Sequence, residues 1–153
     1  MIGQGLVIAE PYISQILSGD KTWELRSRQT TKRGPIALIK KGSGKIVGTA
    51  LLSGVGPKLE LGSFAKYYSK HRFPNEKARS PDFKWWVPWI LDDVVKLDVP
   101  ISYNHPSGAV TWVNLDPVVC ERIARTYDFY SQPKSTLSPR KLEKRLRLRQ
   151  FKR

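Results

Sequence analysis

Cysteine and histidine are scarce in this sequence of 153 residues. It holds one cysteine, Cys120, and two histidines, His71 and His105. A single thiol cannot form an internal disulfide bond, and these three residues lack the spacing of a zinc site. We therefore expect neither a metal nor a cofactor. We also expect both histidines at the surface and Cys120 buried on an apolar helix face.

Long hydrophobic runs are also missing. No stretch approaches the roughly 18 consecutive apolar residues that a membrane-spanning helix requires. The first ten residues lack the basic start of a secretory signal. We expect a protein without a membrane partner, located in the cytoplasm, or in the nucleus if the organism is a eukaryote. Apolar residues make up 40% of the chain, which suffices for the core of one compact domain.

Acidic residues are half as frequent as basic ones. The chain has 27 lysines and arginines against 13 aspartates and glutamates, a net charge of +14. This excess favours a polyanionic partner, and nucleic acid is the leading class. The excess is uneven, because residues 134–153 hold nine basic residues and one acid, Glu143. We predict a mildly basic domain over residues 1–130 and a strongly basic tail over residues 131–153.

Short apolar segments between turn residues predict several strands. The convincing ones lie at 5–9, 22–26, 35–40, 45–53 and 108–115. A glycine-rich turn at 41–44 joins two of them and indicates antiparallel pairing. Residues 85–97 are also rich in strand-forming residues, but Pro88 favours an edge or bulged strand there. Many short strands with few helices predict an α+β fold, a small antiparallel β-barrel with flanking short helices.

Three helices are expected beside the strands. The first follows Pro11 and ends at Gly19, and the second covers 59–70. The third begins at Pro117 and should bury Val118, Val119 and Ile123. The stretch from 71 to 84 is expected to be an exposed loop, because proline, asparagine and serine interrupt it.

One segment carries a motif. Residues 19–26 read Gly-Asp-Lys-Thr-Trp-Glu-Leu-Arg and follow the pattern G-x-K-x-x-E-x-R. Glu10-Pro11-Tyr12 precedes it, and Arg33-Gly34, Ile46-Val-Gly48 and Gly108-Ala-Val-Thr-Trp112 follow it in order. In these features residues 5–115 resemble the ASCH domain, a family built on a PUA-like β-barrel.

The resemblance implies a cleft between the barrel and the first helix, lined by the motif and suited to a nucleotide or nucleobase. The residue types fit such a ligand. Lys21 supplies a mobile ammonium, Arg26 offers a planar fork to phosphate or carbonyl groups, and Glu24 can accept a hydrogen bond from an exocyclic amine. The predicted cleft residues are Tyr12, Lys21, Glu24, Arg26, Arg28, Arg33 and Trp112, with Tyr12 and Trp112 as walls.

Two other interpretations of the motif stay open. Glu24 and Arg26 alone also fit an ordinary ion pair on a solvated strand. The resemblance further implies a hydrolase of a modified nucleoside, of the N4-acetylcytidine type, or a single-strand ribonuclease, with Lys21 and Glu24 as the catalytic groups. The amidohydrolase branch has a threonine nucleophile three residues after the motif lysine, where this chain has Glu24. That mechanism would therefore need another hydroxyl, such as that of Thr22.

The basic tail predicts contacts with phosphates. Pro139 is a favourable first helical residue, and Leu142 and Leu146 are one turn apart. Residues 139–151 therefore form either a basic helix or a disordered arm that orders on its partner. Docking on an acidic protein partner is a further alternative. The tail residues expected to contact nucleic acid, RNA before DNA, are Arg140, Lys141, Lys144, Arg145, Arg147 and Arg149.

Overall fold

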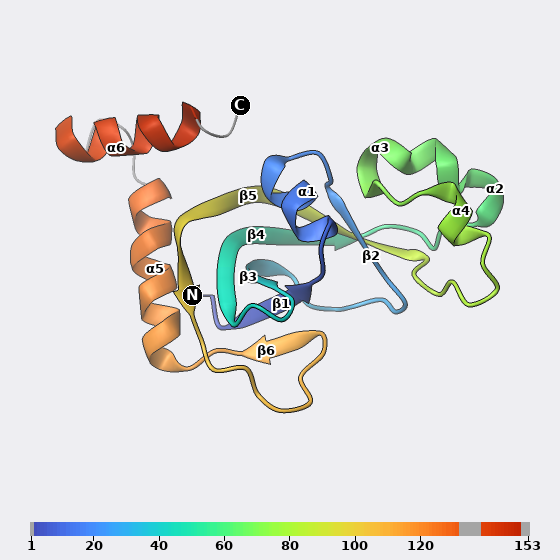
Figure 1. Ribbon diagram of the computed structural model, residues 1–153, viewed down its shortest axis with the longest axis horizontal. Coiled ribbons are helices and arrows are strands. Elements are labelled where there is room, and N and C mark those ends of the chain that lie inside the picture. Colours follow the sequence, from blue (N-terminus) through green and yellow to red (C-terminus); the bar gives the residue numbers. More distant parts are fainter. Residues whose placement is uncertain (1, 132–138, 151–153) are drawn as a thin grey trace.

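A computed structural model describes residues 2–131 and 139–150 and shows a curled sheet with short helices around it (Figure 1). The six strands have the order β2-β5-β4-β3-β1-β6 and form a half-barrel. The predicted α+β, PUA-like class is confirmed. The strands are β1 (Gln4–Ile8), β2 (Trp23–Arg26), β3 (Gly34–Lys40), β4 (Lys45–Val55), β5 (Val87–Ser102) and β6 (Trp112–Asn114).

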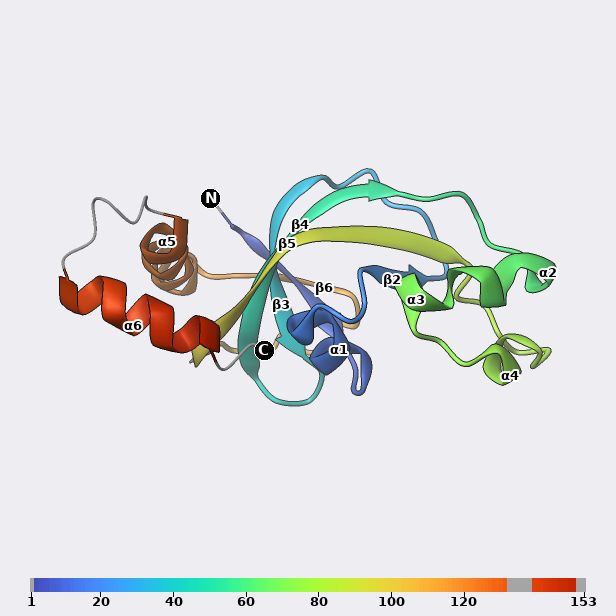
Figure 2. The same ribbon diagram turned by 90° about the horizontal axis from the view of Figure 1, so that it is seen from above.

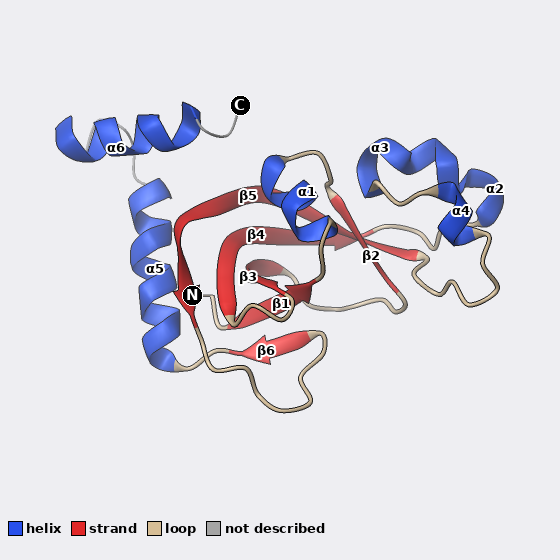
Figure 3. Ribbon diagram, in the orientation of Figure 1, coloured by secondary structure: helices blue, strands red, loops and turns tan. Residues whose placement is uncertain are grey.

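Short helices flank the two ends of the sheet (Figures 2 and 3). Among the described residues, none of the helices is long and apolar enough to cross a membrane. The helical elements are α1 (Tyr12–Ser18), α2 (Leu61–Phe64), the 3-10 turn η1 (Ala65–Tyr67), α3 (Tyr68–His71), α4 (Asn75–Ala78), α5 (Pro117–Ser131) and α6 (Pro139–Gln150).

The sheet contains one parallel pair, which short-range sequence patterns did not predict. β3 and β4 form the expected antiparallel hairpin, whereas β1 and β3 run parallel, with Gly5 opposite Ala37 and Ile8 opposite Lys40. Parallel neighbours need a crossover connection. Here the chain between β1 and β3 contains α1 and β2. The motif-bearing strand is thus placed at the far edge of the sheet, next to β5.

Of the two alternatives expected around Pro88, the edge strand was wrong, because β5 lies inside the sheet between β2 and β4. The bulged strand agrees with the structure, since the register of the β4–β5 pair shifts, for example between Leu52 and Gly54. Pro88 lies opposite Leu25 of β2. Its carbonyl accepts a 2.8 Å hydrogen bond from the N–H of Gly56, one residue beyond the end of β4. The nitrogen of Pro88 faces the same side as that carbonyl, where β4 has already ended. The missing N–H therefore leaves no gap in the β4–β5 ladder.

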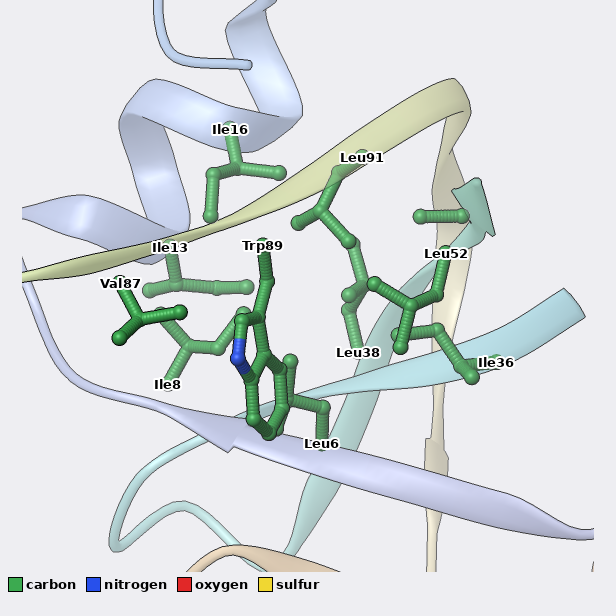
Figure 4. Packing of buried hydrophobic residues seen from close by; sticks show 11 residues of the cluster. Leu6, Ile8, Ile13, Ile16, Ile36, Leu38, Leu52, Val87, Trp89 and Leu91 are labelled. Carbon is green, nitrogen blue, oxygen red and sulfur yellow. The ribbon is translucent and has the colours of Figure 1, made fainter. Parts of the chain in front are cut away.

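The main core fills the space between α1 and the concave side of the sheet (Figure 4). Ile13 and Ile16 of α1 are fully buried there, at the spacing of one helical face. The helix ends at Gly19, which adopts the left-handed conformation (φ 89°), as its sequence predicts. The sheet contributes Leu6, Ile8, Ile36, Leu38, Ala50, Leu52, Val87, Trp89 and Leu91 to this core.

A second core lies under α5. Val119 and Ile123 are buried and Cys120 is 7% exposed, as expected. The prediction for Val118 was wrong, since its side chain is 60% exposed. Val119, Cys120 and Ile123 lie within about 100° of one another around the helix axis, whereas Val118 lies about 100° beyond Val119 on the other side and points to solvent.

We call the segment between β4 and β5, residues 56–86, the insert, and it forms a third core together with Leu25 of β2. The expected exposed loop at 71–84 was wrong, because Phe73, Ala78 and Phe83 are buried. Their partners include Phe64 of α2, whose ring lies 5.6 Å from that of Phe83 in an edge-to-face arrangement. The insert lies beyond one end of the sheet, beside β2 (Figure 2). It contacts the motif segment directly, through a 3.0 Å hydrogen bond from the N–H of Thr22 to the carbonyl of Lys70, despite a long separation in sequence.

Gly48 of β4 lies where a side chain has no room. A Cβ atom there would come within 2.5 Å of Leu17 Cδ2 and 2.8 Å of the Val95 carbonyl oxygen. Because that carbonyl belongs to β5, Gly48→Ala is expected to lower the free energy of unfolding by about 1–3 kcal/mol. Gly3→Ala is the matched control, since nothing lies within 4 Å of its Cβ position. Urea unfolding measures both variants, and equal stability would contradict the close approach.

Candidate functional site

An open cleft of about 730 Å³ lies between β2, the start of α1 and the insert. Its lining combines aromatic rings with charged groups, four basic and two acidic. No group of His, Cys, Asp and Glu side chains in the described part of the chain could hold a metal ion. The lining residues are Val7, Ala9, Tyr12, Glu24, Leu25, Arg26, Ser27, Lys41, Phe73, Lys77, Ser80, Asp82, Phe83, Lys84, Trp85, Val110 and Thr111.

The floor of the cleft carries an ion pair between two motif residues. Arg26 Nη2 lies 3.3 Å from Glu24 Oε2 and donates a 2.7 Å hydrogen bond to the carbonyl of Val7. The side chains of Glu24 and Arg26 are only 5% and 18% exposed. The pair is therefore not the solvated surface pair that was one alternative from the sequence. Both residues line the cleft, and each keeps hydrogen-bonding capacity beyond these contacts.

Lys21 lies beneath the cleft and does not line it. Its side chain is fully buried, and Nζ donates hydrogen bonds to the carbonyls of Trp23 (2.5 Å) and His71 (2.6 Å). Glu24 Oε1 is 3.8 Å away. The expected mobile ammonium was therefore wrong: the group is fixed. Burial lowers the pKa of Lys21 from 10.5 to about 8, against the opposing attraction of Glu24.

His71 is the residue through which Lys21 holds the insert. The prediction of a surface histidine was wrong, because His71 is fully buried. Its Nδ1 accepts the N–H of Phe73, so Nε2 carries the proton and donates to the carbonyl of Phe64. Burial lowers the pKa of His71 below its usual 6.5, and the nearby charge of Lys21 acts in the same direction. The neutral ring thus organises the turn from α3 into the cleft wall.

Stacked aromatic rings form one wall. Tyr12 of α1 stacks on Phe73 of the insert, with ring centroids 4.6 Å apart and planes 9° from parallel. Lys77 Nζ lies 5.9 Å from the Tyr12 ring and 5.5 Å from the Phe73 ring. On the rim, Trp85 is 39% exposed, and Lys84 Nζ lies 5.6 Å from its ring. The wall therefore offers flat apolar surface with positive charge beside it.

Only some of the residues predicted to line the cleft do so in the structure. Tyr12, Glu24 and Arg26 line the cleft. Arg28 and Arg33 are exposed and lie outside it, and Arg33 donates to the backbone carbonyls of Thr30 and Lys32. Trp112 lies behind the floor, stacked on Trp89 at 5.8 Å. The Trp89 ring in turn lies 5.6 Å from the guanidinium of Arg26.

Sequence reasoning missed most of the insert's contribution. Phe73, Lys77, Lys84 and Trp85 line the cleft, but they follow the motif by about 50 to 60 residues. The density of basic and aromatic residues between 66 and 86 is the signal that was available. That density does not show which residues face β2, because the direction of each ring depends on how the insert folds.

The tail contains the helix α6, within the range expected for a basic helix. Arg140, Lys144 and Arg147 are exposed, and Arg147 pairs with Glu143 one turn earlier. The side chains of Lys141, Arg145 and Arg149 lie outside the described part of the structure.

Comparison with protein families matches residues 6–100, more than half of the chain, to the ASCH domain. The chain belongs to the ASCH domain family. In this ASCH protein the matched region runs from β1 into β5 and includes α1, β2 and the insert. The elements that carry the motif and the aromatic wall are therefore part of the family domain, whereas Val110 and Thr111, which also line the cleft, lie outside the matched region.

Solved structures share this fold. The crystal structure of ASCH from Zymomonas mobilis has a TM-score of 0.60 and 14% identity, covering 80% of this chain and 93% of that one. Crystal structures of two mutant proteins of the same ASCH give TM-scores of 0.60 and 0.59, also at 14% identity and 80% coverage of this chain, with 96% and 94% of theirs. No curated protein matches the sequence. At this identity the likeness shows the fold alone.

The buried neutral His71 predicts a pH-dependent stability. Because its pKa is lower in the folded chain, the unfolded chain takes up the proton first as the pH falls. The stability that this residue contributes is complete above about pH 6.5 and decreases below it. Urea unfolding at pH 7.5 and 5.5 measures the loss, which should be smaller in His71→Gln.

His105→Gln is the matched control, because it removes an exposed histidine far from the insert in sequence. It should show the same loss of unfolding free energy between the two pH values as the wild type. An undiminished loss in His71→Gln would contradict the assignment.

Proposed function

We propose that this ASCH protein binds single-stranded nucleic acid, RNA before DNA, and that the cleft receives one base or nucleotide. The observation that carries the proposal is the Glu24–Arg26 pair on the floor of an aromatic-walled, basic-rimmed cleft. A volume of about 730 Å³ lies within the range of small-molecule sites, roughly 300–1,000 Å³.

The floor suits the polar edge of a base and the phosphate beside it. Arg26 keeps donors free besides its bond to Val7, and these match a phosphate or a base carbonyl. Glu24 accepts hydrogen bonds from an exocyclic amine. Because both side chains are already largely desolvated and fixed, a ligand has little ordering left to impose on them.

The wall suits the flat face of the same base. Base stacking on an aromatic ring contributes about 1–3 kcal/mol and does not depend on sequence. The Trp85 ring, 39% exposed on the rim, offers such a face, and Lys77 and Lys84 lie beside the aromatic wall, where they can meet phosphates. A base must be unstacked to enter, which favours a single strand over a duplex.

The tail supports the same class of ligand. A helix with exposed Arg140, Lys144 and Arg147 attracts phosphates without reading sequence. We assign it non-specific affinity, with selection left to the cleft. Docking of the tail on an acidic protein is the alternative, and such binding would survive nuclease treatment.

A second candidate function is hydrolysis of the bound RNA or modified nucleoside. The observation in its favour is the pKa of about 8 for Lys21, close to that of a useful general base or acid. Against it, both short hydrogen bonds of Nζ go to backbone carbonyls beneath the floor. Shortened oligonucleotides or deacetylated cytidine after incubation, lost in Lys21→Ala, would favour the hydrolase.

Arg26→Ala should weaken nucleotide binding by roughly tenfold or more, because a charge-assisted hydrogen bond contributes about 1.5–3 kcal/mol. Titration calorimetry of the full chain with a panel of nucleoside monophosphates measures it. Arg33→Ala is the matched control, since Arg33 is exposed and lies outside the lining. Equal affinities of the two variants would contradict the assignment of the cleft.

Neutralising the tail should make oligonucleotide binding less sensitive to salt. With Arg140, Lys141, Lys144 and Arg145 changed to glutamine in the full chain, the slope of log K against log salt should flatten by roughly 0.7 for each lost phosphate contact with a single strand. A variant that exchanges lysine and arginine at the same four positions is the control and should keep the slope. An unchanged slope in the glutamine variant would remove the tail from the interface.

A further inference from the structure

A second basic and aromatic surface surrounds Trp23 at the start of β2, outside the lining of the cleft. Successive side chains of a strand alternate in direction, so Trp23 faces away from the side on which Glu24 meets the cleft. The Trp23 ring packs against Tyr67 of the insert, with centroids 5.3 Å apart. Lys70 Nζ lies 5.7 Å from the Trp23 ring, and Lys66 Nζ lies 5.7 Å from the Tyr67 ring.

Tyr68 and Arg72 extend this surface. The Tyr68 side chain is 46% exposed, and the Arg72 guanidinium lies 5.5 Å from its ring. Arg72 Nε donates a 2.9 Å hydrogen bond to the backbone carbonyl of Asp20, which holds the guanidinium beside the ring. The Asp20 carboxylate accepts from the Ser18 hydroxyl at 3.1 Å, and the described contacts include no ion pair between it and Arg72. We call the six residues Trp23, Lys66, Tyr67, Tyr68, Lys70 and Arg72 the outer surface.

Trp23 and Tyr67 of the outer surface pack against the core of the insert, but the exposed residues of this surface are not required by that core. Lys66, Tyr68 and Lys70 are exposed, and none of the four ion pairs in the described part of the chain involves them. Three rings with three cations in such a small area are more than solubility requires. Exposed and partly exposed rings with cations beside them suit a ligand that carries both flat groups and negative charge.

A single-stranded nucleic acid has both properties in a regular repeat. Its bases stack on exposed rings, and its phosphates meet lysine and arginine between them. An acidic peptide would use the cations and leave the rings without a partner. We propose that the outer surface is a second contact for single-stranded nucleic acid, so that the physiological ligand is a strand that reaches beyond the cleft and not a free nucleotide. This inference takes its ligand class from the proposed function.

Fluorescence anisotropy with a 15-nucleotide single strand, as RNA and as DNA of the same sequence, tests the proposal on the full chain. The test variant is Lys66→Ala with Lys70→Ala. Lys45→Ala with Lys96→Ala removes the same charge from exposed positions of β4 and β5 and is the matched control. We expect an affinity about fivefold to tenfold lower than the control's, and a salt slope shallower by about 1.4 for two lost phosphate contacts.

Tyr68 tests the aromatic part separately. Tyr68→Ala should weaken binding of the 15-mer about tenfold, whereas Tyr68→Phe should keep the wild-type affinity, because stacking needs the ring and not the hydroxyl. If Tyr68→Ala has no effect and polyglutamate competes through Lys66 and Lys70, the surface is a general anion site and the proposal is overturned. Equal affinities of the two double lysine variants for the 15-mer overturn it as well.

If the cleft does not bind nucleotides, the results differ from those that overturn the outer surface. In that case nucleoside monophosphates do not bind and Arg26→Ala leaves the 15-mer affinity unchanged, while the comparison of the two double variants still reports on the outer surface. If instead the cleft alone binds, Arg26→Ala weakens both ligands and the double lysine variants behave alike. Melting temperatures within a degree or two of the wild type show that the exposed substitutions leave the fold intact.

Discussion

The cleft depends on the buried ammonium of Lys21. Its two short hydrogen bonds go to the backbone of β2, at Trp23, and to the backbone of the insert, at His71. A charge in this position is costly unless several partners surround it, and here two carbonyls and the Glu24 carboxylate share it. Because the two carbonyls belong to segments far apart in the sequence, Lys21 helps to set how the insert meets the motif strand. The backbone hydrogen bond from the Thr22 N–H to the Lys70 carbonyl acts with it. Phe73, two residues beyond His71, is thereby brought against Tyr12.

The same arrangement places an arginine on the floor, beside the glutamate that balances the charge of Lys21. A buried ion pair is seldom more stable than apolar residues of similar volume, since desolvation offsets most of the attraction. Glu24 and Arg26 are nevertheless held at the cleft, with further support from the Val7 carbonyl and the Trp89 ring. Polar groups that are fixed and desolvated before a ligand arrives act more strongly on that ligand than solvated ones. Under the proposed function, Glu24 and Arg26 are the binding groups of the motif, and Lys21 is its structural residue.

The insert shows how function and stability are divided on this fold. Its small aromatic core, with Phe64 and Phe83 at the centre, holds a segment of short helices that would not persist alone. The residues facing β2 complete the cleft, while Lys66, Tyr68 and Lys70 remain exposed on the outer side. Since the rigid half-barrel already fixes β2, the insert can carry two different surfaces without changing the sheet.

Local patterns in the sequence determined the strands β1 to β4, the helix α1 with its Gly19 end, the β3–β4 hairpin and the family, because each depends on residues that are neighbours in the chain. The motif likewise identified Glu24 and Arg26. Only the tertiary structure decided that Lys21 and His71 are buried and joined, that Pro88 lies inside the sheet, and that Phe73, Lys77 and Trp85 face the cleft. Those outcomes depend on contacts between segments tens of residues apart, such as Lys21 with His71. The spacing of apolar residues in the sequence shows which residues of a helix or strand share a face. Which other segment packs against that face depends on long-range contacts.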